Sequence, residues 1–329
     1  MKLAYLIYPE AVVLGESNGI RSQALSWATA LRDRGWTIDL IDTWGTYRWS
    51  EYDVIHVFGG YHDLSWISQL RARNEKVVFS PIWDSNMTIA RLKFYRKLNF
   101  PVLHHSLIDY SHVLKSFKAV FVRSEFEKER IAKGLGVDVG RIIKVPLGFK
   151  MDAGYYNPRR KDICFHVSTL YQPRKNVVRL IQAARKYHFK LVLAGTHGTE
   201  EEFGPIRRAI DGAENITVLG FLPEQELLDY YRCAKVFALP SVAEGVGLVA
   251  LDAGVMGANV VITKAGGPGE YYKGMAYLVD PYSIDDIGTK ICKAMRDEWT
   301  QPHLRDFLIS EYSESRTACR LMSAYESLS

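Results

Sequence analysis

Residues 238–272 combine glycines and an expected helix start, whose backbone amides can bind an anion, with acidic side chains close by. A predicted strand ends in this segment, a turn carrying Glu244 follows, and a helix is expected to begin around Gly247. The first amides of a helix lack acceptors within the helix and lie at the positive end of its dipole. The amides of Gly247, Leu248 and Val249 can therefore hold a phosphate group without a metal ion.

Two carboxylates flank these amides and indicate what the phosphate carries. Glu244 lies beside the predicted anion site, where its oxygens can accept hydrogen bonds from hydroxyl groups. Asp252 lies about two helical turns further along, on roughly the same face, and can hold a second diol. One carboxylate near a sugar, one near a ribose and amides between them predict a nucleotide-sugar pocket. Glu244 as a plain loop carboxylate and Asp252 as a solvated helix residue are the simpler alternatives.

A dinucleotide site is a further alternative, because residues 245–250 satisfy the pattern G-x-G-x-x-A. That fingerprint should directly follow a strand, but the turn separates Pro240 from Gly245. The strand predicted at 258–263 is followed by Lys264 rather than by an acidic ribose ligand. These departures make a dinucleotide-dependent oxidoreductase the weaker interpretation.

The elements that must position these residues form two α/β lobes. A chain of 329 residues corresponds to about two domains. Short apolar runs alternate with amphipathic stretches, which is typical of βα units around parallel sheets. The first lobe is predicted to have strands at 2–8, 37–42, 53–58, 76–80, 119–124 and 141–146, and the second at 163–168, 190–195, 215–220, 235–240, 258–263 and 276–280. The segment 148–161 is the expected linker, and a cleft between the lobes is the expected binding site.

Composition excludes several classes of protein. With 47% hydrophobic and 24% charged residues the chain has a globular balance, unlike disordered, collagen-like or coiled-coil sequences. Its four cysteines are far apart and suggest neither disulfides nor a structural metal, so a reducing cytoplasm is expected. Neither a signal peptide nor a membrane-spanning helix is expected. Residues 1–150 hold 21 Lys plus Arg against 15 Asp plus Glu, a net charge of +6, which suggests an anionic partner, with an ordinary solvated surface as the alternative.

The turn and helix start resemble the donor site of the family-4 glycosyltransferases, which have the GT-B fold. Their signature is an acidic pair written E-x7-E after Pro-Ser, and here Asp252 stands where the family usually has Glu. The residues that carry the resemblance are Pro240, Ser241, Glu244, Gly245, Gly247 and Leu248. The resemblance implies that Glu244 contacts the transferred sugar and Asp252 the ribose, and it makes Gly245, Leu248 and Val249 donor-binding residues.

Other segments resemble the same family along nearly the whole chain. Residues 173–183 resemble its basic phosphate-binding stretch, which makes Arg174 and Lys175 candidates to neutralise the diphosphate. Gly19, in the loop after the first strand, corresponds to one glycine of the Gly-Gly pair that is usual in this family. The resemblance would place it opposite the donor phosphates. Further agreement lies in 121–126, 144–149, 193–198, 218–227 and 265–272. Surface charge, for the two cations, and a simple turn, for Gly19, are the alternatives.

The resemblance fails after the strand at 76–80. Many relatives carry a His-Asp pair there, whereas this chain has Trp83 followed by Asp84. The candidate catalytic residues are Glu244 and, second, Asp84, whose alternative role is to cap the next helix. His56, in the middle of a predicted strand, is expected to be a hydrogen-bonded core histidine rather than an acid or base.

Aromatic and basic residues of the first lobe are candidates for binding the acceptor. Trp66 and Trp83 can stack on sugars, with core packing as the alternative. Residues 91–100 mix aromatic rings with Arg91, Lys93, Arg96 and Lys97, so they can contact an anionic bilayer or a lipid-phosphate acceptor. An exposed helix without such a role is the alternative.

The resemblance implies a retaining glycosyltransferase that moves a hexose-type sugar from a nucleoside-diphosphate sugar to an acceptor hydroxyl. The fold class is α/β, GT-B, with two Rossmann-like parallel-sheet domains facing a central cleft. Residues 1–150 plus about 305–329 would form the acceptor domain, with the C-terminal helix crossing back, and 151–304 the nucleotide-sugar domain. No D-x-D occurs, so neither a metal nor another cofactor is expected.

The expected partners are a nucleotide-sugar donor and an acceptor that is a glycan, a small molecule, or an anionic or lipid-linked compound, and nucleic acid is not expected. A cytoplasmic protein with peripheral contact at the inner membrane surface fits these partners. A non-catalytic GT-B protein that binds sugar nucleotides or glycans is the runner-up. It is supported by Asp252 and by the missing histidine. A GT-B epimerase or phosphorylase is the remaining alternative.

Overall fold

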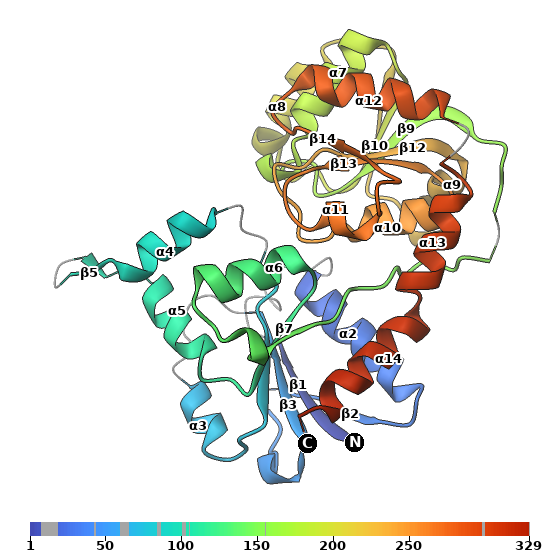
Figure 1. Ribbon diagram of the computed structural model, residues 1–329. Coiled ribbons are helices and arrows are strands. Elements are labelled where there is room, and N and C mark those ends of the chain that lie inside the picture. Colours follow the sequence, from blue (N-terminus) through green and yellow to red (C-terminus); the bar gives the residue numbers. More distant parts are fainter. Residues whose placement is uncertain are drawn as a thin grey trace. The chain divides into compact units, whose positions relative to one another are not determined.

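The computed structural model describes residues 1–7, 19–42, 44–59, 66–83, 87–100, 103–104, 106–154, 156–297 and 300–328, so Asp84 lies outside the described residues. The chain forms two compact units (Figure 1). Unit 1 comprises Met1–Leu147 and Glu314–Ser329, and unit 2 comprises Gly148–Ser313. The sequence predicted these divisions at 150/151 and at about 304/305.

Unit 1 is built on a six-stranded parallel sheet in the order β2-β1-β3-β4-β7-β8. Each strand overlaps one of the predicted ranges, because each is a short run of apolar residues that both faces of a parallel sheet can bury. The strands are β1 (Lys2–Ile7), β2 (Thr37–Leu40), β3 (Val54–Phe58), β4 (Val77–Ser80), β7 (Ala119–Val122) and β8 (Ile142–Lys144). A separate two-stranded antiparallel pair, β5 (Asn99–Phe100) and β6 (Leu103–His104), was not predicted.

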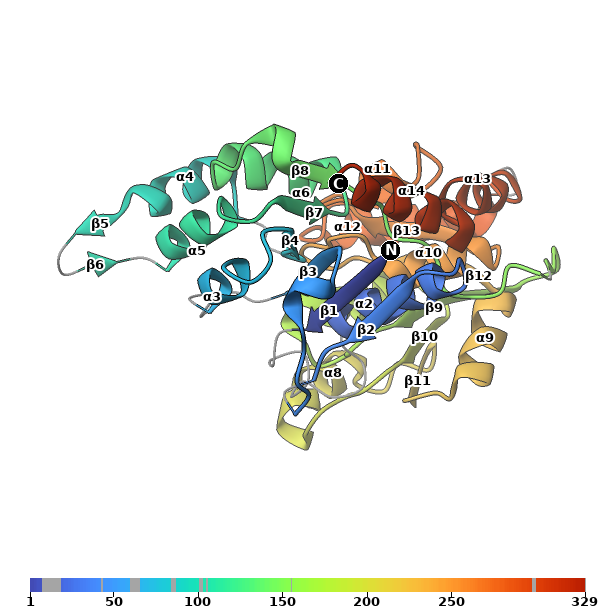
Figure 2. The same cartoon turned by 90° about the horizontal axis from the view of Figure 1, so that it is seen from below.

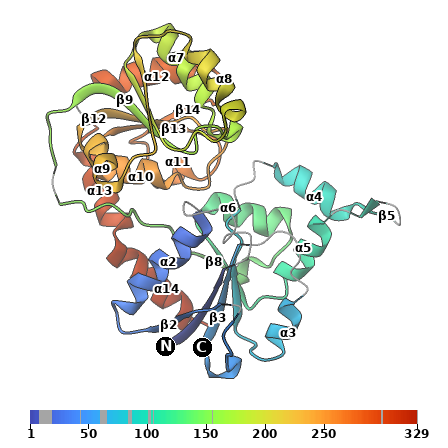
Figure 3. The ribbon, with the colours of Figure 1, turned by 180° about the vertical axis from the view of Figure 1, so that it is seen from behind.

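Helices cover both faces of this sheet (Figures 1 and 3). The helices of unit 1 are α2 (Gly19–Arg32), α3 (Ile67–Arg71), α4 (Ile89–Lys97), α5 (Leu107–Leu114), α6 (Glu125–Glu129) and α14 (Glu314–Glu326), with short turns η1 (Trp49–Glu51), η2 (Arg130–Gly134) and η3 (Val139–Arg141). Helices α2 and α14 pack together on one face, and α4 packs against α5 on the other (Figure 2). The last helix of the chain therefore belongs to the first unit.

A buried polar cluster ties α14 to the sheet of unit 1. The Tyr325 hydroxyl lies 2.6 Å from Nδ1 of His56 and 2.8 Å from the Tyr5 hydroxyl. The other ring nitrogen of His56, Nε2, lies 2.8 Å from Oγ of Ser80. Burial lowers the pKa of His56 well below its ordinary value, because the charged ring would lose its hydration. The prediction of a hydrogen-bonded core histidine is confirmed.

Unit 2 repeats the architecture with a six-stranded parallel sheet in the order β11-β10-β9-β12-β13-β14. Its strands again overlap the six predicted ranges, so the predicted fold class is confirmed. They are β9 (Lys161–Val167), β10 (Leu191–Ala194), β11 (Ile216–Gly220), β12 (Ala234–Leu239), β13 (Asn259–Thr263) and β14 (Tyr277–Val279).

The helices of unit 2 also form two layers. Helix α7 (Val177–Tyr187) packs against α8 (Glu200–Ile210) and α12 (Ile284–Arg296), whereas α10 (Leu248–Val255) packs against α9 (Glu224–Cys233) and α13 (His303–Tyr312). Figure 1 shows these two groups on opposite faces of the sheet. The short helices η4 (Pro173–Lys175) and α11 (Pro268–Tyr271) lie in loops that follow strands. None of the helices in the described residues is long and apolar enough to span a membrane.

The polar cluster around Tyr325 gives a stability prediction. We expect Tyr325→Phe to lower the free energy of unfolding of unit 1 by about 1–3 kcal/mol, because two buried polar groups lose a partner. Urea unfolding followed by tryptophan fluorescence measures this, since six of the seven tryptophans lie between residues 27 and 83.

Tyr47→Phe is the matched control, since it removes a hydroxyl whose contact, with the Asp42 amide, is exposed. We expect a change within about 0.5 kcal/mol for this variant. Equal losses in the two variants would show that the buried cluster does not anchor α14.

Candidate functional site

The candidate site lies where the strand order of unit 2 reverses direction. Strand β9 has β10 on one side and β12 on the other, so the loops that follow β9 and β12 leave toward opposite faces of the sheet. Ligands of open parallel sheets bind at the carboxyl ends of the strands beside such a switch point. The loops in question are residues 168–176 after β9 and residues 240–247 after β12.

A buried carboxylate joins these two loops. The side chain of Glu244 is only 7% exposed. Its Oε1 lies 2.8 Å from Nζ of Lys175, and its Oε2 lies 3.5 Å from Nη1 of Arg174. The same Nη1 donates to the Ala243 carbonyl, and the Val242 amide donates to the Arg174 carbonyl. The structure therefore brings together the three residues that the sequence placed around a diphosphate and its sugar.

Asn176 holds the cations against the end of β12, and the sequence analysis missed it. Its Nδ2 donates to the carbonyls of Pro240 at 2.8 Å and Pro281 at 2.7 Å, while its Oδ1 accepts from Arg179. The residue is 5% exposed and has a φ of +60°, a conformation that Asn tolerates better than most residues. The available signal was an Asn directly before the apolar-periodic run that begins at Val177, but its two acceptors lie far away in the sequence.

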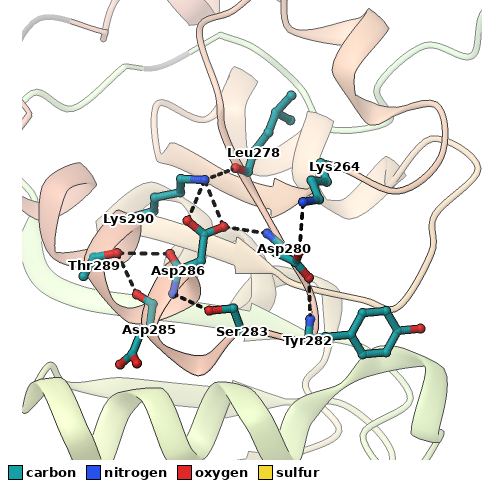
Figure 4. A network of polar contacts seen from close by, with 9 residues as sticks. All are labelled: Lys264, Leu278, Asp280, Tyr282, Ser283, Asp285, Asp286, Thr289 and Lys290. Carbon is teal, nitrogen blue, oxygen red and sulfur yellow. Dashed lines mark hydrogen bonds and ion pairs between the residues drawn. The ribbon is translucent and has the colours of Figure 1, made fainter.

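A polar network supports the loop that carries Pro281 (Figure 4). Asp286 accepts a hydrogen bond from the Asp280 amide at 2.6 Å and pairs with Nζ of Lys290 at 2.8 Å. Ser283 caps α12 by accepting from the Asp286 amide, and Lys264 pairs with Asp280 at 2.9 Å. The network fixes the start of α12 to the ends of β13 and β14. It thereby positions the carbonyl that Asn176 binds.

Gly247 shapes the start of α10. It has a φ of +76°, and a Cβ at this position would lie 2.8 Å from Cδ1 of Ile262. Only glycine satisfies both conditions without strain. Leu248 and Val249 follow as half-buried first residues of α10, whose amides have no acceptor within the helix. Gly245 is buried in the same turn.

The backbone of Glu244 is also fixed. Its amide donates to the Ala265 carbonyl at 3.0 Å, and its carbonyl accepts from the Gly267 amide at 3.1 Å. A side chain at Gly266 would overlap the Glu244 carbonyl oxygen, so the close approach requires glycine there. The segment after β13 thus holds the turn in place through the backbone of Glu244.

Asp252 does not take part in the ion pairs of this cluster. Its side chain is buried, and Oδ1 accepts a hydrogen bond from the Lys150 amide at 2.7 Å. Burial raises the pKa of its carboxyl to about 6, and the hydrogen bond from Lys150 opposes this increase. The alternative of a solvated helix residue is wrong, because the carboxylate binds main chain inside the unit. A contact between Asp252 and a ribose stays a prediction.

His166 is a second residue that the sequence analysis missed. It is fully buried in β9, and burial lowers the pKa of its imidazole to about 4. A carbonyl can only accept, so Nδ1, 2.7 Å from the Ala238 oxygen, carries the proton. The Ser168 hydroxyl then donates to Nε2. A neutral histidine therefore orients a hydroxyl at the carboxyl end of β9.

The structure corrects one prediction in unit 1. The side chain of Trp83 is 1% exposed and stacks on Tyr110 with ring centroids 5.6 Å apart. Its amide donates to Oε1 of Glu127 at 2.7 Å. A sugar cannot stack on a ring whose faces are covered by the core, so Trp83 is not an acceptor platform. Trp66 is half-buried against the same core, and its role stays a prediction.

The remaining predicted residues of unit 1 lie on helices. Gly19 is the first residue of α2, and a Cβ there would meet nothing within 4 Å, so packing does not require glycine. Helix α4 carries the four predicted basic residues. Arg91, Lys93 and Lys97 are exposed, whereas Arg96 is half-buried with its guanidinium beside Gly136.

Comparison with known proteins finds a family model that matches most of unit 2. Residues 155–311 match the family model described as glycosyl transferases group 1, a range that includes the whole ion-pair cluster. An O-antigen chain mannosyltransferase B of Escherichia coli is 26% identical over 208 residues, which cover 56% of this chain and 53% of that protein. The chain thus spans about half the length of this curated relative.

Solved structures agree with the fold along the whole chain. A sucrose-phosphate synthase from Thermosynechococcus elongatus has a TM-score of 0.79 at 19% identity, covering 100% of this chain and 99% of that one. The Anabaena protein HepE, solved in complex with UDP-glucose, has a TM-score of 0.77 at 14% identity, covering 99% and 100%. At such identities the likeness establishes the GT-B fold alone.

The conformation of Gly247 gives a prediction for the site. We expect Gly247→Ala to destabilise unit 2 by clearly more than the roughly 1–2 kcal/mol that a left-handed alanine costs, because the methyl group also meets Ile262. Gly212→Ala is the control, since Gly212 has a φ of +70° but a methyl group there would meet nothing within 4 Å. Urea unfolding followed by circular dichroism compares the two variants. Equal losses of unfolding free energy in the two variants would contradict a steric requirement for glycine at the start of α10.

Proposed function

We propose that this chain, whose residues 155–311 belong to the glycosyl transferases group 1 family, transfers a hexose-type sugar from a nucleoside-diphosphate sugar to an acceptor hydroxyl. One observation carries the proposal. Lys175 and Arg174 converge on the buried carboxylate of Glu244 at the switch point of a Rossmann-like sheet. Two cations, a carboxylate and the free amides of a helix start are the groups that a sugar diphosphate requires.

The cations would stabilise the leaving group. As the bond between sugar and diphosphate breaks, negative charge grows on the phosphate oxygens. Lys175 and Arg174 carry three and five N–H donors, so each can keep its contact with Glu244 while donating to phosphate. The amides of Leu248 and Val249 would add the positive end of the α10 dipole. These groups are held in place before the reaction, which is what makes such stabilisation effective.

Glu244 would orient the transferred sugar by accepting hydrogen bonds from its hydroxyls. Both cations bind this carboxylate, and carboxylate oxygens accept hydrogen bonds from hydroxyls. The turn between β12 and α10 has its backbone fixed by Ala265 and Gly267, which limits movement of the carboxylate. We assign Glu244 a substrate-binding role at the reacting centre. Asp84 remains a second candidate and lies outside the described residues.

We further propose that the reaction retains the anomeric configuration and needs no metal. The retaining course follows from the resemblance to family-4 enzymes, with attack on the same face as the departing diphosphate. The cation pair and helix amides supply the positive charge that a metal ion would otherwise provide. Asp252 would contact the ribose only after exchanging its hydrogen bond with the Lys150 amide.

The acceptor would bind unit 1, and α4 suggests its chemistry. Arg91, Lys93 and Lys97 are exposed there beside Phe94, whose exposed fraction is 59%. Exposed cations next to an exposed ring favour an anionic or lipid-linked acceptor and peripheral contact with an anionic membrane surface. Arg96 would contribute less, because its guanidinium packs beside Gly136.

A non-catalytic protein that binds sugar nucleotides is the second candidate. The burial of Trp83, where many relatives carry a histidine, and the bond between Asp252 and Lys150 favour it. Such a protein would keep the ion-pair cluster for binding and lack turnover. Activity measurements on a panel of UDP-, GDP- and ADP-sugars separate the two candidates.

We expect Lys175→Met to reduce kcat for sugar transfer by about 10²–10³-fold, because a preorganised donor to the leaving group is lost. Lys186→Met is the matched control, since Lys186 pairs with Asp285 on the exposed surface, and its kcat should stay within twofold. Initial rates are measured with the donor that the panel identifies. If Lys175→Met keeps full activity, the cluster is not the catalytic site. Absence of turnover in the unmodified chain with every donor would favour the binding protein.

The stereochemical course is testable on the product. We expect the new glycosidic bond to have the same anomeric configuration as the donor, which proton NMR of the isolated product measures through the anomeric coupling constant. An inverted linkage would end the retaining assignment while leaving the donor site intact.

A further inference from the structure

A cavity of about 390 Å³ lies in unit 1, away from the carboxyl ends of its strands. Its lining residues precede three neighbouring strands: Glu75 comes just before β4, residues 116–118 lead into β7, and Arg141 directly precedes β8. Arg71, at the end of α3, completes the lining. The cavity therefore sits at the amino edge of the sheet, opposite the edge at which parallel sheets usually bind substrates.

Positive charge dominates this cavity. Arg71, Lys118 and Arg141 face it together with a single carboxylate, that of Glu75. Within the described part of the chain, none of these three cations forms an ion pair. Many other cations of unit 1 are paired, as Lys133 is with Glu129. Three unpaired cations around one cavity repel one another, and an anion between them would relieve that repulsion.

The frame that holds these charges is rigid. Nη1 of Arg141 donates to the Lys115 carbonyl at 2.9 Å, and Oγ of Ser116 donates to the Val113 carbonyl at 2.7 Å. Phe117 is fully buried and stacks on Phe79 with ring centroids 4.7 Å apart. The segment before β7 is thereby fixed to the core. The Arg141 guanidinium is held to this segment, so ordering it on binding costs little further conformational entropy.

We propose that this cavity binds a phosphomonoester that also carries hydroxyl groups, either a soluble sugar or polyol phosphate or the headgroup of a phospholipid. Guanidinium and ammonium groups are the side chains that bind phosphate oxygens most strongly. The carboxylate of Glu75 accepts hydrogen bonds from hydroxyls and repels a ligand that is anionic throughout. The site lies in unit 1 and is separate from the proposed donor site, which belongs to unit 2.

Calorimetric titration of the full chain tests the proposal. The background is Lys175→Met, so that binding in unit 2 is weakened, and the probes are glucose 1-phosphate and inorganic phosphate at 0.15 M salt, about the physiological ionic strength. We expect saturable binding of glucose 1-phosphate, with a Kd that rises at least tenfold when Lys118→Gln and Arg141→Gln are combined. The control combines Lys128→Gln and Lys133→Gln, which remove the same charge from unit 1 but do not line this cavity, and its Kd should stay within twofold.

Glu75→Gln tests the hydroxyl preference separately. Removing this negative charge should lower the Kd of inorganic phosphate and reduce the preference for glucose 1-phosphate over inorganic phosphate. Circular dichroism and thermal unfolding establish that each variant is folded. Equal weakening by both double variants would mean that only net charge matters, and would overturn the proposal. An unchanged preference in Glu75→Gln would overturn the assignment of hydroxylated ligands.

Vesicle sedimentation distinguishes the two sources of phosphate. Phosphatidylcholine vesicles are compared with vesicles that also contain phosphatidylinositol 4-phosphate, whose headgroup carries a phosphomonoester and hydroxyl groups. If glucose 1-phosphate competes with the phosphatidylinositol 4-phosphate vesicles, and only the Lys118/Arg141 double variant loses binding to both, the cavity accepts either source. If that variant loses vesicle binding alone, the lipid headgroup is the ligand. No saturable binding in either assay rejects the site.

Discussion

The interaction on which the site depends is the shared carboxylate of Glu244. A buried carboxylate without partners would cost several kcal/mol, so its ionised form requires Lys175 and Arg174. The same pairing holds two cations close to one another at the end of a strand, which their mutual repulsion would otherwise oppose. The side chain of Asn176 and the backbone bonds of Glu244 hold the loops that carry these three side chains. The cost of bringing the two cations together is thereby met during folding.

Unusual backbone conformations allow the loops after β9 and β12 to bring Lys175, Arg174 and Glu244 into contact. Asn176 and Gly247 both have positive φ values, and each lies directly before the first residue of a helix, α7 and α10 respectively. Asn176 also uses its side chain to join the loops after β12 and β14, so one residue fixes both the turn and its neighbours. The polar network at the start of α12 extends this support to the far strand of the sheet (Figure 4).

Both sheets were predictable from the sequence, because each strand is a compact apolar run and parallel strands are buried on both faces. The meeting of Glu244, Lys175 and Arg174 was predictable through family resemblance. Asn176 and His166 were not, since their partners are carbonyls and a hydroxyl whose positions depend on the folded chain. Trp83 was misassigned because a tryptophan after a strand can face either a cleft or the core, and only packing decides which.

The chain leaves unit 1 after β8, forms all of unit 2, and returns to unit 1 only with α14. This order affects how the protein folds while it is being synthesised. Tyr325 completes the hydrogen bonding of His56, a residue translated long before it. On the ribosome, β1 to β8 must therefore wait for the entire second unit to be made before their core closes. Unit 2 is continuous in sequence and can fold first. Until then all six strands of the first sheet are present, and only the covering helix α14 with Tyr325 is missing.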